Sequence, residues 1–337
     1  MLGAVSFSKL VKNVVNTYYV VAPALVVSAM AMVVFGISDN LIINGICTFI
    51  IGIGISFNFI TVQSYLNQSD ATDKTRITGL YAFFFAMGFA IMIILGPILF
   101  SLANLIAFVV SSLFLLLVAI LVIRFKISLK RIVVKKQKVS LSIFLVLALG
   151  GFLYGYIENA IVIMYPIYLV DLVSIELIGI IVSSYGLGGI VGLIPLIGIS
   201  EKIGIYKACI LFATLSFITF GISILITMSF HDLPFVLATG VLVLISAAAG
   251  AFVGVIYPIT LAGLNDVGLN QNGIIYATSV YTFLYSLGSS TGPAFSGVSM
   301  DVFGRLGFFY TCMVLFIIFI VLCVSKGFKK DNAISVT

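Results

Sequence analysis

The chain has 337 residues, of which 62% are hydrophobic and only 8% are charged, and its formal net charge at pH 7 is +6. A soluble protein of this length needs a polar shell around its core, and this composition cannot supply one. The composition therefore excludes a soluble globular fold and indicates that lipid is the main solvent of the chain.

Apolar segments long enough to cross a bilayer recur along the whole sequence, since a helix needs about 20 apolar residues to span the hydrocarbon core. Backbone groups in lipid must pair within the structure, and these runs do not alternate as barrel strands do, so the segments are predicted to be helices. We expect an all-α, polytopic integral membrane protein. Its predicted spans are 14–36, 40–62, 77–99, 102–123, 140–166, 176–199, 207–229, 234–262, 274–298 and 304–325.

The basic residues predict the orientation of these spans. If the N-terminus is cytoplasmic, every Lys and Arg except Arg305 falls on the cytoplasmic side. This is the positive-inside bias in a strong form. We therefore expect a multi-pass protein of the cell membrane with both termini in the cytoplasm.

The longest polar interruption, "RFKISLKRIVVKKQKV" (124–139), carries seven positive charges and no acid. A basic segment of this kind is typical of a cytoplasmic linker that contacts anionic lipid. The linker divides the chain into an N-terminal half of four spans (1–123) and a C-terminal half of six spans (140–337).

Glu158 is the one acidic residue that lies well inside a predicted span. Placing a charged acid near the bilayer centre costs about 2.5–3.5 kcal/mol, so such residues usually face a bundle interior or an aqueous cavity. Burial favours the neutral form of a carboxyl group. Glu158 is therefore a candidate for proton coupling or for binding a cationic substrate group. The alternative is a protonated side chain that only donates an interhelical hydrogen bond.

The neighbours of Glu158 in the sequence support a polar, cavity-facing stripe. Helical spacing places Tyr154, Ile161, Val162 and Tyr165 on the same face as Glu158. Asn159 lies about 100° away around the helix, where we expect it to bond a neighbouring helix.

No enzyme chemistry is visible in the sequence. No catalytic triad, metal-ligand cluster or pair of carboxylates is present, which argues against an enzyme, and no cofactor or metal is expected. The four cysteines all fall inside predicted spans, where we expect small buried apolar side chains without disulfides. They are Cys47, Cys209, Cys312 and Cys323.

Several motifs resemble those of the major facilitator superfamily. "GISEKIGIYK" (198–207) resembles the signature loop between two of its helices, and "YSLGSSTGPAFSGVSMDVFGRLG" (285–307) resembles its eleventh helix and exit loop. "FIIGIGISFNFITVQSYLNQS" (49–69) and "GLYAFFFAMGFAIMIILGPILF" (79–100) resemble its fourth and fifth helices, with Gly96-Pro97 where many members carry a Gly-Pro pair.

The resemblance implies a secondary transporter in which two helical halves rock about a central site and move a small solute by alternating access. We expect proton coupling through Glu158, membrane lipids as surroundings, a monomer, and no nucleic acid partner. The helices that line the path in this superfamily correspond to 40–62, 140–166 and 234–262. Besides Glu158, the candidate path residues are Tyr154, Asn159, Asn58, Gln63, Tyr257 and, in the span 274–298, Tyr285. For each tyrosine taken alone, packing or interfacial anchoring is the alternative.

The resemblance also implies a gating loop on the cytoplasmic side. Its acid can interact with the dipole of a neighbouring helix and so latch the inner side closed. The alternative is a solvated charge pair that aids topology. The residues concerned are Gly198, Glu201, Lys202, Gly204 and Lys207.

One feature departs from the superfamily pattern: four spans precede the linker where six are usual. The opening "GAVSFSKLVKN" (3–13) resembles the end of a second helix, so the first two helices are expected to be missing. A misplaced start, a truncated gene and a true ten-helix protein all fit this pattern. A truncated membrane protein that does not transport is the alternative function.

Overall fold

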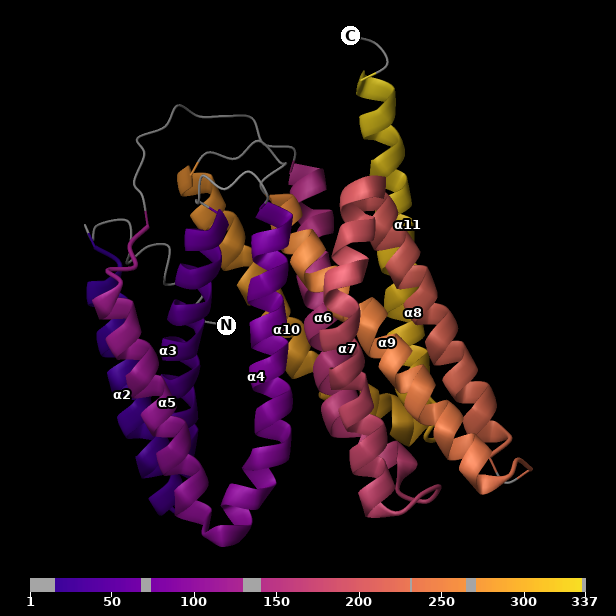
Figure 1. The fold of residues 1–337 in the computed structure, drawn as a ribbon, viewed down its shortest axis with the longest axis horizontal. Coiled ribbons are helices and arrows are strands. Elements are labelled where there is room, and N and C mark those ends of the chain that lie inside the picture. The colour runs from indigo at the N-terminus through magenta and orange to yellow at the C-terminus, as the bar shows by residue number, and fades with distance from the viewer. Residues whose placement is uncertain (1–15, 68–73, 130–140, 231, 265–270, 335–337) are drawn as a thin grey trace. The chain divides into compact units, whose positions relative to one another are not determined.

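The computed structural model describes residues 16–67, 74–129, 141–230, 232–264 and 271–334, and in these ranges the regular structure is entirely helical. The described part of the chain contains ten helices (Figure 1). They are α2 (Tyr18–Ile37), α3 (Leu41–Asn67), α4 (Lys74–Leu102), α5 (Asn104–Arg124), α6 (Leu141–Leu169), α7 (Ile175–Ile203), α8 (Ile205–Met228), α9 (Phe235–Gly263), α10 (Gln271–Phe303) and α11 (Gly307–Ile334). Each coincides with one predicted span, which confirms the all-α fold class.

Eight of the helices in the described ranges are long and apolar enough to cross a membrane; α4 and α10 are not among the eight. The middle of α10 reads "GSSTGPAFSG" (288–297), and its Ser, Thr and Gly residues lower the hydropathy of that helix. The chain is therefore a multi-pass membrane protein whose α10 is more polar than the spans around it.

Two glycines with positive φ end helices where the predicted boundaries came too early. Gly204 has φ +85° and separates α7 from α8, whereas Gly304 has φ +70° and follows α10. This backbone region is readily accessible to glycine and costly for other residues. The helices α7 and α10 thus run to Ile203 and Phe303, a few residues past the predicted ends at 199 and 298.

The chain divides into two compact units, which are described separately. The first unit comprises Met1–Lys74, Ile91–Lys138 and Gly268–Phe283. In it α2 packs against both α3 and α5. Its core joins residues of α2, α3, α5 and the segment after α5, namely Val21, Ala22, Leu25, Phe57, Ile60, Ala119, Val122 and Leu129.

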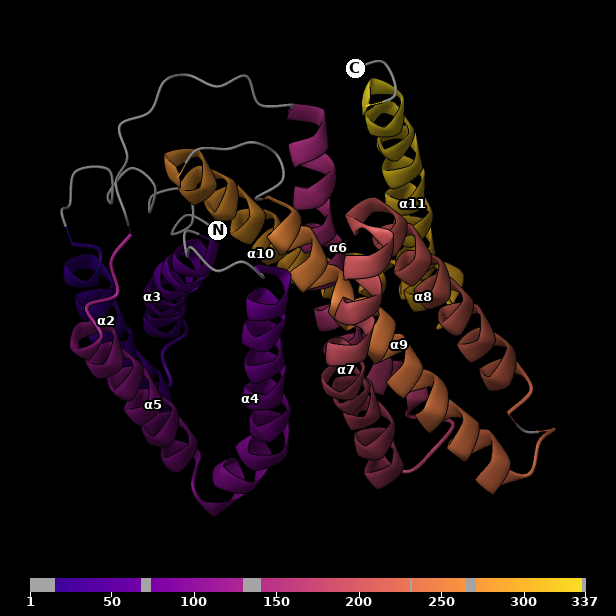
Figure 2. The same cartoon turned by 45° about the horizontal axis from the view of Figure 1, so that its top comes forward.

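The second unit comprises Thr75–Ala90, Val139–Val267 and Leu284–Thr337. Here α7 and α9 lie side by side over much of their length, as both views show (Figure 1, Figure 2). The helix α9 also packs against α6 and α8, and α11 packs against α6 and α8. This unit holds Glu158.

The contact α7–α9 depends on glycines. A Cβ atom at Gly188 would lie 1.8 Å from the carbonyl oxygen of Ala247, and one at Gly250 would lie 1.8 Å from that of Tyr185. Small residues let helix backbones approach in lipid, where no hydrophobic effect drives association. The abundant glycine of the sequence therefore serves helix packing here.

Three sequence predictions lie partly or wholly outside the described residues. The opening segment 3–13 is outside them, as is most of the basic linker (130–139), so the division into halves of four and six spans stays a prediction. Gly96 and Pro97 lie within α4, but their side chains are not among those described. All four cysteines are buried, as expected for small apolar side chains: Cys47, Cys209, Cys312 and Cys323.

Candidate functional site around Glu158

The helix α6 carries Glu158 and is the most enclosed of the candidate spans. In α6, 72% of the span is buried, whereas the other seven spans range from 17% to 39%. Glu158 itself is 5% exposed. The acid therefore lies in the protein interior, as its position in the sequence predicted.

Two phenols hold the carboxyl group of Glu158. Tyr154, one turn earlier on α6, donates a hydrogen bond of 2.9 Å to Oε1, and Tyr285 on α10 donates one of 2.8 Å to Oε2. Both carboxyl oxygens thus have a partner, which a buried polar group requires. Among the described residues, no Lys or Arg forms an ion pair with Glu158.

A third phenol packs against these two. The ring of Tyr257 on α9 lies with its centroid 5.0 Å from that of Tyr154 and 5.7 Å from that of Tyr285. The rings of Tyr154 and Tyr285 are stacked at 6.0 Å. Two of the predicted path residues, Tyr154 and Tyr285, therefore bond Glu158, and a third, Tyr257, packs on their rings.

Close backbone contact between α6 and α10 brings Tyr285 within reach. A Cβ atom at Gly155 would lie 2.3 Å from the carbonyl oxygen of Tyr285. On α10, Cβ atoms at Gly288 and Gly292 would lie 2.1 and 2.4 Å from the carbonyl oxygens of Phe152 and Tyr156. A larger residue at any of these three glycines would push the two helices apart and lengthen the bond between Tyr285 and Glu158.

Asn159 supports the same pair of helices. Its Nδ2 donates a hydrogen bond of 2.9 Å to Oγ of Ser289 on α10 and one of 3.2 Å to the carbonyl oxygen of Gly155. The expected bond from Asn159 to a neighbouring helix is confirmed. This places Asn159 beside the acid as a link between α6 and α10.

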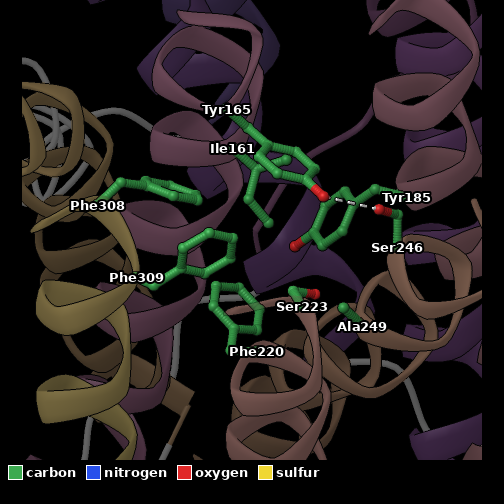
Figure 3. Close-up of a pocket in the computed structure, with 9 residues that line it drawn as sticks. All are labelled: Ile161, Tyr165, Tyr185, Phe220, Ser223, Ser246, Ala249, Phe308 and Phe309. Atoms are coloured by element: carbon green, nitrogen blue, oxygen red, sulfur yellow. Dashed lines mark hydrogen bonds between the residues drawn. The ribbon is translucent and has the colours of Figure 1, made fainter. Parts of the chain in front are cut away.

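Farther along α6 the stripe turns to other partners. Tyr165, predicted on the same face as Glu158, has its hydroxyl 3.3 Å from Oγ of Ser246 on α9 (Figure 3). The next phenol, Tyr168, donates to Oγ1 of Thr227 on α8. Beyond the helix ends, the exposed side chains of Arg305 and Asp171 form an ion pair.

Two of the predicted path residues belong to the first unit. Gln63 on α3 is 1% exposed, and its Oε1 accepts a hydrogen bond of 3.1 Å from Thr282 on α10. Asn58, also on α3, is half-buried, and its Oδ1 has no hydrogen-bond partner among the described residues. Their role in a path stays a prediction.

The predicted gating residues surround the sharp junction of α7 and α8. Gly198, Glu201 and Lys202 lie in the last turns of α7, Gly204 is the junction, and Lys207 lies in the first turn of α8. The side chains of Glu201, Lys202 and Lys207 are exposed. The predicted loop is thus a single residue between two helices, and the latch stays a prediction.

The sequence analysis did not identify Ser289 and Ser246 as partners of the stripe. Two small-residue repeats could have located the first: "GFLYG" (151–155) on α6 and "GSSTG" (288–292) on α10 have the spacing that lets helices approach. Nothing in the sequence distinguishes Ser246 from the other serines of the spans.

Among the described residues, no group of three or more His, Cys, Asp or Glu side chains could hold a metal ion. The contacts around Glu158 are those of a buried carboxyl with neutral donors.

Solved structures share this fold. The Escherichia coli fucose:proton symporter FucP is 14% identical, with a TM-score of 0.72 over 96% of this chain and 87% of that one. A bacterial homologue of the iron transporter ferroportin is 13% identical, with a TM-score of 0.68 over 96% and 86%. The human organic anion transporter MFSD10 (TETRAN) is 17% identical, with a TM-score of 0.64 over 95% and 79%. At these identities the likeness concerns the fold alone.

Comparison of the sequence with family models identifies the family of the chain. No curated protein matches the chain. A family model described as Major Facilitator Superfamily matches residues 147–333, which is more than half of the chain and includes Glu158, Tyr257 and Tyr285. This agrees with the expectation that the protein transports and is not an enzyme. The chain belongs to the Major Facilitator Superfamily of membrane transporters.

Proposed function

We propose that the protein is a proton-coupled secondary transporter that moves a small solute by alternating access, with Glu158 as the group that binds the proton. It acts as a monomer in the cell membrane with both termini in the cytoplasm. The observation that carries the proposal is a buried carboxyl group held by two phenols and, among the described residues, by no cation.

Opposing effects act on the two charge states of Glu158. Desolvation disfavours the ionised form, whereas hydrogen bonds from Tyr154 and Tyr285 favour it. A small change in either effect, such as the entry of water or the loss of one phenol, then changes the protonation state. This balance is what a carrier group needs, because the proton must be bound in one conformation and released in another.

Among the described residues, the side chains that bond the carboxyl group of Glu158 are phenols. Tyr154 of α6 and Tyr285 of α10 donate to the acid, and the ring of Tyr257 on α9 packs against both of these phenols. Among the described residues, no second carboxyl group bonds this cluster, so we expect Glu158 to bind one proton.

The experiment is a screen for solutes that move protons. The purified protein is reconstituted into liposomes that contain a pH-sensitive dye, and hexoses, amino acids, organic amines and organic anions are added one class at a time. We expect one class to change the internal pH with the native chain. Glu158→Gln should lower that rate at least tenfold, because the amide cannot exchange a proton.

Asp301→Asn is the matched control, since it also replaces an acid by its amide but at an exposed position near the end of α10. This variant should keep the native rate. Undiminished solute-dependent proton movement in Glu158→Gln would contradict the proposal, as would an equal loss in both variants.

A further inference from the structure

A small cavity lies in the second unit, beyond Glu158 along α6. Its volume is about 10 Å³. Aromatic rings form most of its wall, and Figure 3 shows them around one space. The residues that line it are Ile161, Tyr165, Tyr185, Phe220, Ser223, Ser246, Ala249, Phe308 and Phe309.

One polar group of this wall has no bond of its own. The hydroxyl of Tyr185 has no hydrogen-bond partner among the described residues, although the residue is only 9% exposed. Figure 3 shows this hydroxyl directed into the cavity. A buried hydroxyl without a hydrogen-bond partner is costly, so a partner in the cavity would be favoured.

Other polar atoms stand at the same wall. The hydroxyls of Tyr165 and Ser246 lie 3.3 Å apart, and each can still accept a hydrogen bond. Ser223 donates to the carbonyl oxygen of Thr219 and also keeps acceptor capacity. A molecule beside Tyr185 therefore finds a donor and several acceptors.

The volume of the cavity indicates which molecule it can hold. One water molecule needs roughly 10–15 Å³ measured in this way, together with two to four polar partners. The cavity meets both conditions and is too small for a solute. A cavity lined only by apolar side chains stays dry, and this one is not of that kind.

The cavity continues the polar stripe that begins at Glu158. Ile161 lies one turn beyond the acid on α6 and Tyr165 two turns beyond, roughly 10 Å along the axis at 1.5 Å per residue. Across from them, Tyr185 on α7 interacts electrostatically with both Glu158 and Tyr154. Tyr185 is thus a wall residue of the cavity that also interacts with the acid and its donor.

We propose that this cavity binds one water molecule and that Tyr185 and this water form the route by which protons reach Glu158 from the Tyr165 end of α6. In the predicted orientation, that end faces the outside. The inference rests on the proposed function, because it requires Glu158 to exchange protons.

The transfer balances without any other reactant. A hydronium ion at the aqueous end gives a proton to the bound water, the water gives one to Tyr185, and Tyr185 gives its own to the pair formed by Tyr154 and Glu158. No hydrogen bond among the described residues holds the Tyr185 hydroxyl in place, so the transfer requires its side chain to move from the water toward that pair. Both phenols are neutral before and after, and the net change is a protonated Glu158.

The first test measures the exchange of the Glu158 proton without any solute. Infrared difference spectra assign the carboxylic acid band of Glu158 by its loss in Glu158→Gln. Its shift after rapid transfer to D₂O gives the exchange rate. We expect Tyr185→Phe to slow this exchange at least tenfold.

Ala249→Leu provides a second variant, because the larger side chain fills the cavity and removes no hydroxyl. It should slow the exchange as Tyr185→Phe does. Tyr156→Phe is the matched control: Tyr156 lies on α6, is buried, and bonds Ser296 away from this cavity. Its exchange should stay within twofold of the native rate.

The second test detects the water itself. Brief X-ray radiolysis in ¹⁸O-labelled water hydroxylates side chains next to bound water, and mass spectrometry locates the label. We expect label on the rings of Tyr165, Tyr185 or Phe309 in the native chain and its loss in Ala249→Leu.

The outcomes separate the two proposals. Native exchange in Tyr185→Phe, equal slowing in Tyr156→Phe, or an unlabelled cavity would overturn the route and leave the role of Glu158 intact. Absence of any carboxylic acid band that disappears in Glu158→Gln would overturn the route and the proposed function together.

Discussion

The hydroxyl of Tyr285 lies 2.8 Å from Oε2 of Glu158, although 127 residues separate the two in the chain. Because Gly155, Gly288 and Gly292 bring the backbones of α6 and α10 into contact, this bond is set by helix packing. Close packing therefore couples the helix that carries the acid to the helix that carries its donor. A conformational change that separated the two helices would break this bond and alter the environment of the acid.

Removing the Tyr285 hydroxyl should impair proton-driven transport. A hydrogen bond to a charged group contributes about 1.5–3 kcal/mol, so Tyr285→Phe is expected to lower pH-gradient-driven uptake of the solute found in the screen at least tenfold. The measurement is the initial uptake rate in proteoliposomes. Tyr156→Phe, which removes a phenol bonded to Ser296, should keep the native rate. Equal effects of the two substitutions would contradict a specific role for Tyr285.

The α6–α10 contact should not tolerate a methyl group. In Gly288→Ala the new Cβ atom would lie 2.1 Å from the carbonyl oxygen of Phe152, and overpacking of this kind costs about 1–3 kcal/mol. Gly297→Ala on the same helix meets only the sulfur of Met164 at 3.8 Å, an ordinary contact. Thermal unfolding followed with a thiol-reactive dye, which reports the buried cysteines, should show a lower midpoint for the first variant alone.

The α7–α9 contact offers a second comparison within one helix. A Cβ atom at Gly250 would lie 1.8 Å from the carbonyl oxygen of Tyr185, whereas one at Gly240 would meet nothing within 4 Å. Gly250→Ala should therefore lower the unfolding midpoint in the same dye assay and Gly240→Ala should not. If the two variants melt together, the close approach of α7 and α9 is not a feature of the folded protein.

The ion pair between Arg305 and Asp171 should contribute little to stability. The two side chains remain 46% and 63% exposed, and an exposed pair is typically worth less than about 1 kcal/mol. Arg305→Gln is expected to change the unfolding midpoint only slightly at low salt and not at all at 1 M salt, where the Debye length is about 3 Å. A large decrease in the unfolding midpoint that does not depend on salt would contradict this expectation and show that the ion pair contributes substantially to stability.

Much of the helical architecture could be predicted, because a helix that crosses lipid needs a run of about 20 apolar residues. The predicted spans 207–229 and 234–262 differ from α8 (Ile205–Met228) and α9 (Phe235–Gly263) by at most two residues at either end. The rule fails at helix ends, where polar residues continue a helix beyond the hydrocarbon core. Thus α7 runs through Glu201 and Lys202 up to Gly204, the residue whose backbone stops it.

Within α6, the spacing of residues predicted the contact at the candidate site directly. The spacing of Tyr154 and Glu158 on α6 predicted their contact, since residues four apart share a face. The same rule placed Tyr165 on this face, two turns farther along, where its hydroxyl bonds Ser246. Contacts between helices, such as the one from Tyr285, depend on rotation and register that glycine packing decides, and hydropathy carries no information about either.

The most direct test of the central claim compares two kinds of flux in Glu158→Gln. Counterflow exchanges labelled for unlabelled solute with no net proton movement, whereas accumulation against a gradient requires the proton. We predict that Glu158→Gln retains counterflow and loses pH-gradient-driven accumulation at least tenfold. Accumulation at the native level in this variant would contradict the account, because Glu158 would then not be the group that carries the proton.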